Sequence, residues 1–314
     1  MYEWHRLIQT VVNEIDERIK LQCSEDLTLQ FLSRRLGYSG FHTTRRFKEI
    51  SGLSLGDYIR LRKLAFALID VRDTKHGFLD IAVKYGFGSH EAFTRAFKTA
   101  YGVTPKDYRK KPLPVALRTK ISVFDRYFFG LGEIGMVKST EDVKVYFITM
   151  PAHKFLHVKN YESNGYWDFW EKQDIIPGQN CDTICGLLDS IKGKLDGKDD
   201  VTGKYSGQIM AYIYEDGGKK VEAYGVRLPE NFSGTVPENM LLKNIPEAEY
   251  IVFEHGPFNY EEESETVGKK LQDAVESFDF SKTEYKPDAS SGRIGYFYFI
   301  PECFEKRIQP VARN

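Results

Sequence analysis

One segment of this chain occurs twice, fifty residues apart. The stretch RRFKEISGLSLGDY begins at residue 45, and the stretch RAFKTAYGVTPKDY begins at residue 95. Because the offset is constant, we expect both copies to form the same local structure. The residues that are identical at this offset include Thr44 and Thr94, Arg45 and Arg95, Phe47 and Phe97, Lys48 and Lys98, Gly52 and Gly102, Asp57 and Asp107, and Tyr58 and Tyr108.

Each copy carries the signals that begin and end a helix. Ser39 and Ser89 stand where a side-chain oxygen can cap the first turn, and Gly52 and Gly102 stand where a left-handed residue can end the helix. The following SLGD and TPKD place an acid three residues after a capping hydroxyl, and the second has a proline at the first helical position. A further helix is therefore predicted after each copy.

Another helix is predicted in front of each copy. LQFLSRRLGY and FLDIAVKYGF are amphipathic and end at Gly37 and Gly86, which lie forty-nine residues apart. The one-residue difference in offset falls in the short link before Ser39 and Ser89, where a connection between helices tolerates it. The order helix, glycine turn, helix predicts two helix-turn-helix units.

The central helix of each unit has an outward face suited to the DNA major groove. In the second copy Phe93 and Phe97 belong to an apolar stripe at helical spacing, and the offset transfers this assignment to Phe47 and Ile50. Arginine can hold both acceptors of a guanine edge, and Thr or Phe can contact a thymine methyl group. The alternative is that two helical hairpins with solvated charged faces pack together. The residues expected to face outward are Gly40, Phe41, Thr44, Arg45 and Lys48 in the first copy, and His90, Glu91, Thr94, Arg95 and Lys98 in the second.

Residues from about 9 to 110 resemble the AraC/XylS-type DNA-binding domain. The residues that carry the resemblance are GYSGFHTTRRFKEISGLSLGDYIRLRK and FLDIAVKYGFGSHEAFTRAFKTAYGVTPKDYR. The resemblance implies an all-α domain in which a long helix around YIRLRKLAFALIDV spaces two recognition helices for adjacent major-groove segments. One chain would then read an asymmetric site in double-stranded DNA.

The resemblance also implies roles for individual residues. Lys48 and Lys98 suit phosphate. For His42 it is the repeat register that predicts an inward position, where a packed or capping histidine is favoured over a base reader. Glu91 departs from the polar amides often found at its position, and as an acid it could accept from cytosine or repel the backbone. The implied base-contacting residues are Phe41, Thr44 and Arg45 in the first unit and His90, Glu91, Thr94 and Arg95 in the second.

The distribution of charge agrees with a polyanion-binding first half. Through Lys111 the chain has 20 Lys and Arg against 13 Asp and Glu, and beyond it 24 against 32, so the halves carry +7 and −8. The first twenty residues lack the apolar core of a secretory signal, and no apolar run reaches the length of a membrane span. We expect a soluble, cytoplasmic protein of two domains. Its four cysteines are too few and too scattered for a disulfide framework: Cys23, Cys181, Cys185 and Cys303.

The acidic half reads as an α+β domain. KPLP breaks the last helix of the first half and places a linker at residues 112–142. Strands are then predicted in AHKFLHVKN, GQIMAYIY, VEAYGVRL, EYIVFEH and IGYFYFI, with CFEKRIQPV as a further strand and YEDGGKKV as a hairpin. Helices are predicted near YWDFWEK and EEESETVGKKLQDAVESF, and PAHKFLHV aligns with PEAEYIVF ninety-five residues later.

This half resembles the GyrI-like effector-binding domain, with two β-α-β-β units around a central groove over residues 143–312. Fused to an AraC-type domain, it implies a sensor of small amphipathic or aromatic molecules. The resemblance implies a buried glutamate in the closing strand, where FEKRIQP offers Glu305, and Glu222 in the matching strand of the first unit is the alternative. Either could be surface charge, and the aromatics could be ordinary core. The aromatic candidates for the groove are Tyr166, Trp167, Trp170, Tyr224, Phe258, Tyr296 and Tyr298.

We find no catalytic residue, metal site or cofactor motif. His153 and His157 would be roughly 13 Å apart in a strand, too far for one zinc ion. The sequence therefore predicts a transcriptional regulator with a DNA-binding domain at 1–111, a linker at 112–142 and an effector domain at 143–314. The family resemblance implies activation through RNA polymerase, and we expect no enzyme activity and no membrane. The alternatives are that the second domain hydrolyses small molecules or docks a protein.

Overall fold

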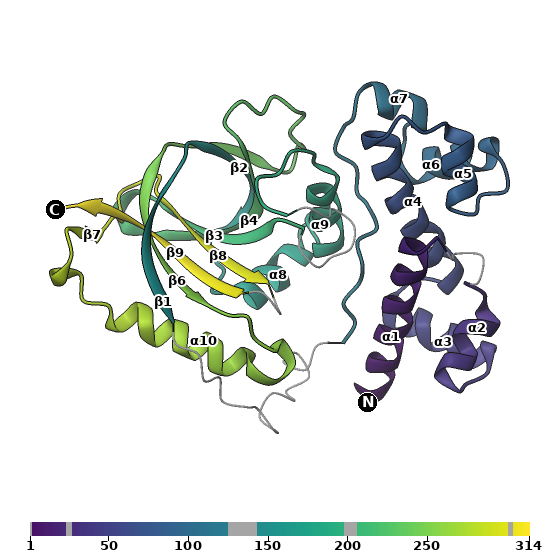
Figure 1. Cartoon of the computed structure of the whole chain (residues 1–314), viewed down its shortest axis with the longest axis horizontal. Coiled ribbons are helices and arrows are strands. Elements are labelled where there is room, and N and C mark those ends of the chain that lie inside the picture. Colours follow the sequence, from purple (N-terminus) through teal and green to yellow (C-terminus); the bar gives the residue numbers. More distant parts are fainter. Residues whose placement is uncertain (1, 23–26, 125–142, 198–205, 301–303) are drawn as a thin grey trace. The chain divides into compact units, whose positions relative to one another are not determined.

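The structure is a computed structural model that describes residues 2–22, 27–124, 143–197, 206–300 and 304–314. It contains a helical unit formed mainly by the first 124 residues and a sheet unit formed mainly by residues 143–314 (Figure 1). Cys23, Cys303 and most of the predicted linker lie outside the described residues. Among the described helices, none is both long and apolar enough to cross a membrane.

The helical unit contains the predicted helices and one amino-terminal helix. In the first copy of the repeat, Ser39 Oγ accepts a hydrogen bond from the His42 N–H, and in the second Ser89 Oγ accepts one from the Ala92 N–H. Gly52 and Gly102 both have φ of 74° at the carboxyl ends, as predicted. The helices are α1 (Tyr2–Lys20), α2 (Leu29–Leu36), α3 (Gly40–Ser51), α4 (Leu55–Asp73), α5 (Phe78–Lys84), α6 (His90–Tyr101) and α7 (Pro105–Lys110).

The two glycine turns have the same hydrogen bonds. The Gly37 N–H donates to the Arg34 carbonyl and the Tyr38 N–H to the Ser33 carbonyl, at 3.1 and 3.2 Å. Forty-nine residues later, the Gly86 N–H donates to the Val83 carbonyl and the Phe87 N–H to the Ala82 carbonyl, at 2.9 and 2.8 Å. This is the Schellman arrangement, which needs a left-handed glycine. The predicted one-residue shift in offset is confirmed.

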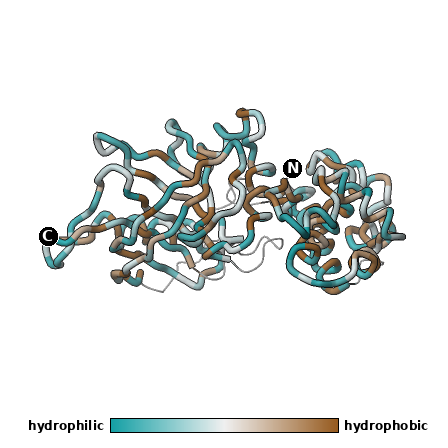
Figure 2. The backbone as a smooth tube through the Cα atoms, turned by 90° about the horizontal axis from the view of Figure 1, so that it is seen from above, coloured by the Kyte–Doolittle hydropathy of each residue, from teal (hydrophilic) through white to brown (hydrophobic). Residues whose placement is uncertain are grey.

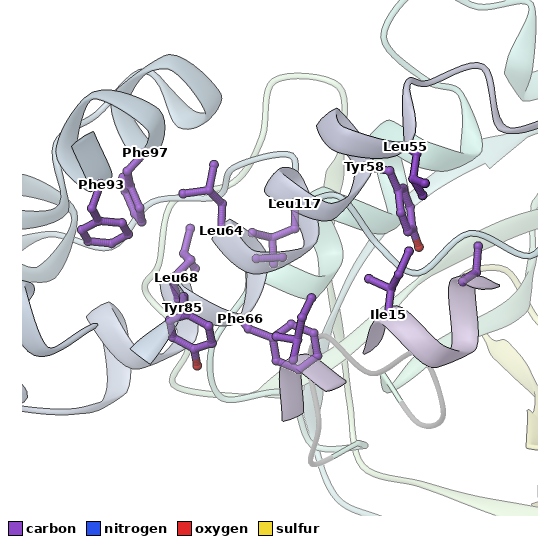
Figure 3. Packing of buried hydrophobic residues seen from close by; sticks show 14 of the residues in the cluster. Ile15, Leu55, Tyr58, Leu64, Phe66, Leu68, Tyr85, Phe93, Phe97 and Leu117 are labelled. Atoms are coloured by element: carbon purple, nitrogen blue, oxygen red, sulfur yellow. The ribbon is translucent and has the colours of Figure 1, made fainter. Parts of the chain in front are cut away.

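Both helix-turn-helix units pack on α4. Phe47 and Tyr58 lie 5.4 Å apart between ring centroids, and their counterparts Phe97 and Tyr108 lie 5.9 Å apart. All four side chains are buried. Figure 3 shows Phe93 and Phe97 at one end of the shared core and Leu55 and Tyr58 at the other, with Leu64 and Leu68 of α4 between them.

A buried ion pair joins α1 to α4. The Arg62 guanidinium, 0% exposed, donates from Nε and Nη2 to the two Asp16 carboxylate oxygens at 2.9 and 2.6 Å. Its remaining Nη1 donates to the Arg118 carbonyl. The guanidinium therefore connects three separate segments of chain.

Residues 115–124, which we call the strap, lie in the extended chain that follows α7. Val115 and Leu117 are buried in the helical core. The Gln9 side chain of α1 donates to the Ile121 carbonyl at 3.3 Å and accepts from the Val123 N–H at 2.8 Å. This part of the predicted linker thus packs with the helices.

The sheet unit contains all the predicted strands and several that the sequence did not reveal. The unpredicted strands are β1 (Lys144–Met150), β5 (Leu241–Ile245) and β7 (Tyr285–Pro287). Helix α9 (Cys181–Ser190), most of which belongs to the helical unit, was not predicted either. The predicted elements are β2 (His153–Asn160), α8 (Tyr166–Asp174), β3 (Gln208–Tyr214), β4 (Lys220–Pro229), β6 (Ala248–His255), α10 (Tyr260–Ser277), β8 (Ile294–Ile300) and β9 (Phe304–Arg313). Hydrophobic residues recur along the strands, and many of the connecting loops are hydrophilic (Figure 2).

The strand order shows two halves, one formed by β1 to β4 and the other by β5, β6, β8 and β9, which exchange their first strands. It runs β1-β6-β9-β8-β3-β4-β2-β5, with β7 paired to β9. The first strand of each half pairs with the second strand of the other, β1 with β6 and β5 with β2, and the halves meet where β8 pairs with β3. Every pairing among the described strands is antiparallel.

We expect the Asp16→Asn substitution to destabilise the helical unit by about 3–5 kcal/mol, because it leaves the Arg62 charge buried without its partner. Arg35→Ala is a matched control, since Arg35 pairs with Glu14 while 60% exposed, and such pairs contribute about 0–1 kcal/mol. Urea denaturation of residues 1–124 measures both effects. Equal midpoints for the two variants would contradict the structural role of the ion pair.

We also expect residues 1–124 to be more stable than residues 1–111. Burial of a side chain such as Val115 or Leu117 contributes about 1.5–3 kcal/mol, so the shorter fragment should lose roughly 3 kcal/mol or more. Denaturation of the two fragments under one set of conditions measures the difference. If both unfold at the same urea concentration, the strap is not part of the core.

Candidate nucleic-acid interface

The outward faces of α3 and α6 are equivalent. From residue 41 to 53 the order of buried, half-buried and exposed residues is the same as from 91 to 103. Thr43 and Phe47 are buried in α3, where Phe93 and Phe97 are buried in α6. The candidate DNA-contacting residues lie on the opposite side: Phe41, Arg45, Lys48, His90, Glu91, Arg95 and Lys98 are exposed, and Thr44 and Thr94 are half-buried.

The start of each recognition helix carries part of this face. Phe41, in the first turn of α3, is 76% exposed although it is a large apolar side chain. In the first turn of α6, hydrogen bonds from its own backbone and from Ser89 lower the pKa of the Glu91 carboxyl. Glu91 is therefore ionised at neutral pH, and the helix dipole favours an acid at this end.

His42 packs within an aromatic cluster rather than facing outward. Its ring lies 5.0 Å from Trp4 and 5.6 Å from Tyr38. The Arg46 guanidinium lies 5.5 Å from the Trp4 ring. The predicted inward position of His42 is confirmed, and the cluster braces α3 against α1.

The two recognition helices differ in how their arginines are paired. The Arg45 Nε lies 3.3 Å from a Glu49 oxygen, and Arg46 Nη1 lies 3.0 Å from the other. The position equivalent to Glu49 in α6 is Thr99. The sequence signal for this pairing is an acid four residues after an arginine on a helix.

The length of α4 matches the geometry of duplex DNA. Its 19 residues span about 28 Å at 1.5 Å per residue. Successive major-groove segments on one face of DNA are about 34 Å apart. The length of α4 is therefore compatible with the prediction that α3 and α6 contact neighbouring turns of one duplex.

In the sheet unit, the candidate residues divide between two faces. Glu222 and Tyr224 lie on the same face as Glu305. Side chains alternate between the two faces along each strand, and the register of β3, β4, β8 and β9 aligns these positions. Tyr296 and Tyr298 lie on the opposite face, in the core with Phe155 and Ile209. The expectation that all seven aromatics line one groove is wrong for these two, and Tyr212, Phe297 and Phe299 take that face instead.

Tyr296 and Tyr298 each form a hydrogen bond with a polar side chain. The His153 Nδ1 donates to the Pro151 carbonyl, so its Nε2 accepts from the Tyr296 hydroxyl at 2.6 Å. Burial lowers the pKa of His153, which keeps the ring neutral in this role. The Tyr298 hydroxyl donates to Asp196, whose carboxylate also binds Arg227 through two hydrogen bonds of 2.7 Å.

Four of the predicted aromatics gather where α8 meets β4. Trp170 and Tyr224 have ring centroids 4.8 Å apart, and Tyr166 lies 5.1 Å from Trp167 and 6.3 Å from Tyr224. Tyr166 and Trp167 are 38% and 46% exposed, whereas Trp170 is buried. Phe258 is not part of this group, because it is buried near His255 and Phe299.

The two candidate glutamates occupy equivalent places. Glu222 stands opposite Asn160 and Glu305 opposite His255, and those partners lie ninety-five residues apart, the offset of the second duplication. Glu222 accepts the Gly165 N–H at 2.7 Å through one oxygen, and its other oxygen is buried without a hydrogen-bond partner among the described residues. Glu305 is 3% exposed, and burial raises its pKa while Arg307 lowers it.

Metal ligation has no visible support in the described part of the chain. No group of three or more His, Cys, Asp or Glu side chains there is arranged to hold a metal ion. Cys181 and Cys185 are half-buried and are not joined in a disulfide.

The chain matches known proteins over its helical unit. A family model described as a helix-turn-helix domain matches residues 32–111. The TetD protein of transposon Tn10 from Escherichia coli is 36% identical over 112 residues, which are 36% of this chain and 81% of TetD. The regulatory protein SoxS of Salmonella typhimurium is 34% identical over 106 residues, which are 34% of this chain and 95% of SoxS.

A further relative has a longer match. The right origin-binding protein of Escherichia coli strain K12 is 41% identical over 137 residues, 43% of this chain and 40% of that protein. The matches to TetD and SoxS cover most of those proteins. Together with the repeated helix-turn-helix geometry, they establish that this chain belongs to the AraC/XylS family of DNA-binding transcription regulators.

Proposed function

We propose that the chain regulates transcription by reading one asymmetric DNA site with α3 and α6, under the control of a small molecule bound by the sheet unit. Residues 1–111 would contact DNA, and residues 143–314 would form a GyrI-like effector domain. The observation that carries the DNA-reading part is the identical burial order of the two outward faces. RNA polymerase is the proposed partner in activation.

Base reading is assigned to the outward residues of the two recognition helices. Arg45 and Arg95 can each make a bidentate contact with guanine, and Phe41, Thr44 and Thr94 can contact thymine methyl groups. His90 and Glu91 extend the second reader toward its first turn. Lys48 and Lys98 lie nearer the carboxyl ends of the helices and are assigned to phosphate.

The effector site is assigned to the face of the sheet that carries Glu222 and Tyr224. Tyr166 and Trp167 give it exposed aromatic surface, and Glu222 gives it a carboxylate with one uncommitted oxygen. Aromatic rings beside a carboxylate favour flat compounds with a positive charge. Glu305 is a weaker candidate for this role, because Arg307 already lies 3.3 Å from it.

The function is tested by selecting duplex DNA from a random pool with the full-length protein at a stated salt concentration. We expect one asymmetric motif of two boxes about one helical turn apart. A palindromic motif would contradict reading by a single chain. The absence of any enriched sequence would contradict DNA reading by α3 and α6.

We predict that Arg45→Ala and Arg95→Ala each relax base preference in a different box, by about 1–3 kcal/mol for a bidentate contact that is fully formed. Lys48→Ala and Lys98→Ala should instead weaken binding evenly across sequences and lower the salt dependence by about one unit of slope. Fluorescence anisotropy on the selected site and on single-base variants measures both quantities. If the arginine variants behave like the lysine variants, the arginines contact phosphate.

We predict that a planar aromatic cation quenches the fluorescence of Trp167 and Trp170, and that Glu222→Gln weakens its binding by about 1–2 kcal/mol, roughly 5–30-fold. A neutral analogue of the same shape should bind both proteins equally. Tyr298→Phe is the matched control, because Tyr298 lies on the opposite face. Loss of binding in the control but not in Glu222→Gln would place the site elsewhere, and recovery of altered compound would indicate hydrolysis.

A further inference from the structure

Glu49 lies one helical turn beyond Arg45 on the outward face of α3 and pairs with two arginines. Its carboxylate oxygens are 3.3 Å from Arg45 Nε and 3.0 Å from Arg46 Nη1. The Arg45 and Glu49 side chains are 52% and 46% exposed. The pair therefore lies on the surface that the proposed function assigns to DNA.

The second recognition helix has no such pair. Thr99 stands where α3 has Glu49, and none of the described residues forms an ion pair with Arg95. Glu91, four residues before Arg95, attracts it electrostatically but does not form an ion pair with it. Arg95 can thus turn toward a base without first leaving a carboxylate.

The first turn of α3 also presents fewer side-chain groups than the first turn of α6. The exposed His90 begins α6, whereas Gly40, which has no side chain, begins α3. A Cβ atom at Gly40 would come within 3.1 Å of Leu29 Cδ2, so the packing of α2 favours glycine there. The first reader therefore has fewer groups to offer at the end of the helix that approaches bases.

We propose that Glu49 restrains Arg45 and weakens base reading by α3, so that α6 supplies most of the sequence preference. This inference rests on the proposed reading of duplex DNA by both helices. A pair between positions i and i+4 draws the guanidinium toward the carboxyl end of the helix, while helix-turn-helix proteins contact bases near the amino end. An ionised carboxylate on this face also repels the phosphates.

The repeat provides a reciprocal experiment on the full-length protein. Glu49→Thr gives α3 the residue that α6 has at this position, and Thr99→Glu gives α6 the residue of α3. Glu49→Gln removes the charge while keeping the shape of the side chain. We expect Glu49→Thr and Glu49→Gln to bind the selected site roughly twofold to fivefold more tightly, with sharper discrimination at the first box only. Thr99→Glu should weaken binding and blunt discrimination at the second box.

Base discrimination at the first box shows whether Glu49 weakens or supports base reading by Arg45. If Glu49→Gln leaves discrimination there unchanged, Glu49 has no influence on reading. If discrimination falls, the carboxylate holds Arg45 in its reading position, which is the opposite of the inference. Thermal melting of each variant verifies that the helices remain folded.

Nuclear magnetic resonance of arginine side chains tests the ion pair without DNA. The Arg45 Nε–H signal should be less mobile than that of Arg95 in the wild type, and the two should become alike in Glu49→Gln. Equal mobility in the wild type would contradict the inference alone. Failure of the wild type to select any duplex would contradict the proposed function, and the inference with it.

Discussion

The geometry of the helical unit depends on one buried guanidinium. Arg62 lies at the middle of α4, and its hydrogen bonds reach Asp16 in α1 and the Arg118 carbonyl in the strap. A buried charge is tolerated only where its hydrogen-bonding groups are satisfied, so this site permits little change in the relative positions of the three segments. Because both helix-turn-helix units pack on α4, the interaction also restricts how the two readers are placed.

Duplication and divergence act on different parts of the repeat. The caps, glycine turns and inward aromatics are retained in both copies, because each is needed to form and pack the same two helices. Most outward positions are less constrained by packing. Thr44, Arg45 and Lys48 are the same in both copies, whereas Glu49 corresponds to Thr99 and Gly40 to His90, so the copies share a scaffold and part of their outward face and differ in the rest.

Much of the helical unit and most strands could be predicted from the sequence, because local signals specify them. Ser39 and Gly52 act within their own helix, and β6 and β8 contain the apolar runs YIVF and YFYFI. The packing of the strap against the helices could not be predicted, because an extended chain gives no helical period. Two buried residues, Val115 and Leu117, are too few to form a recognisable pattern. The face on which Tyr296 and Tyr298 lie could not be predicted. Alternation along one strand shows that its side chains point to two faces, but the register between strands decides which residues of different strands lie on the same face.

The central claim is that α4 holds two unequal readers at one fixed separation. The most direct measurement is binding to the selected site after inserting about 5 base pairs between its boxes, which places them on opposite faces of the duplex, and after inserting a full turn of about 10 base pairs. A helix of 19 residues cannot stretch to either spacing, so both insertions should reduce affinity to that of the second box alone. Full affinity after either insertion would mean that the two units move independently, and would contradict this account.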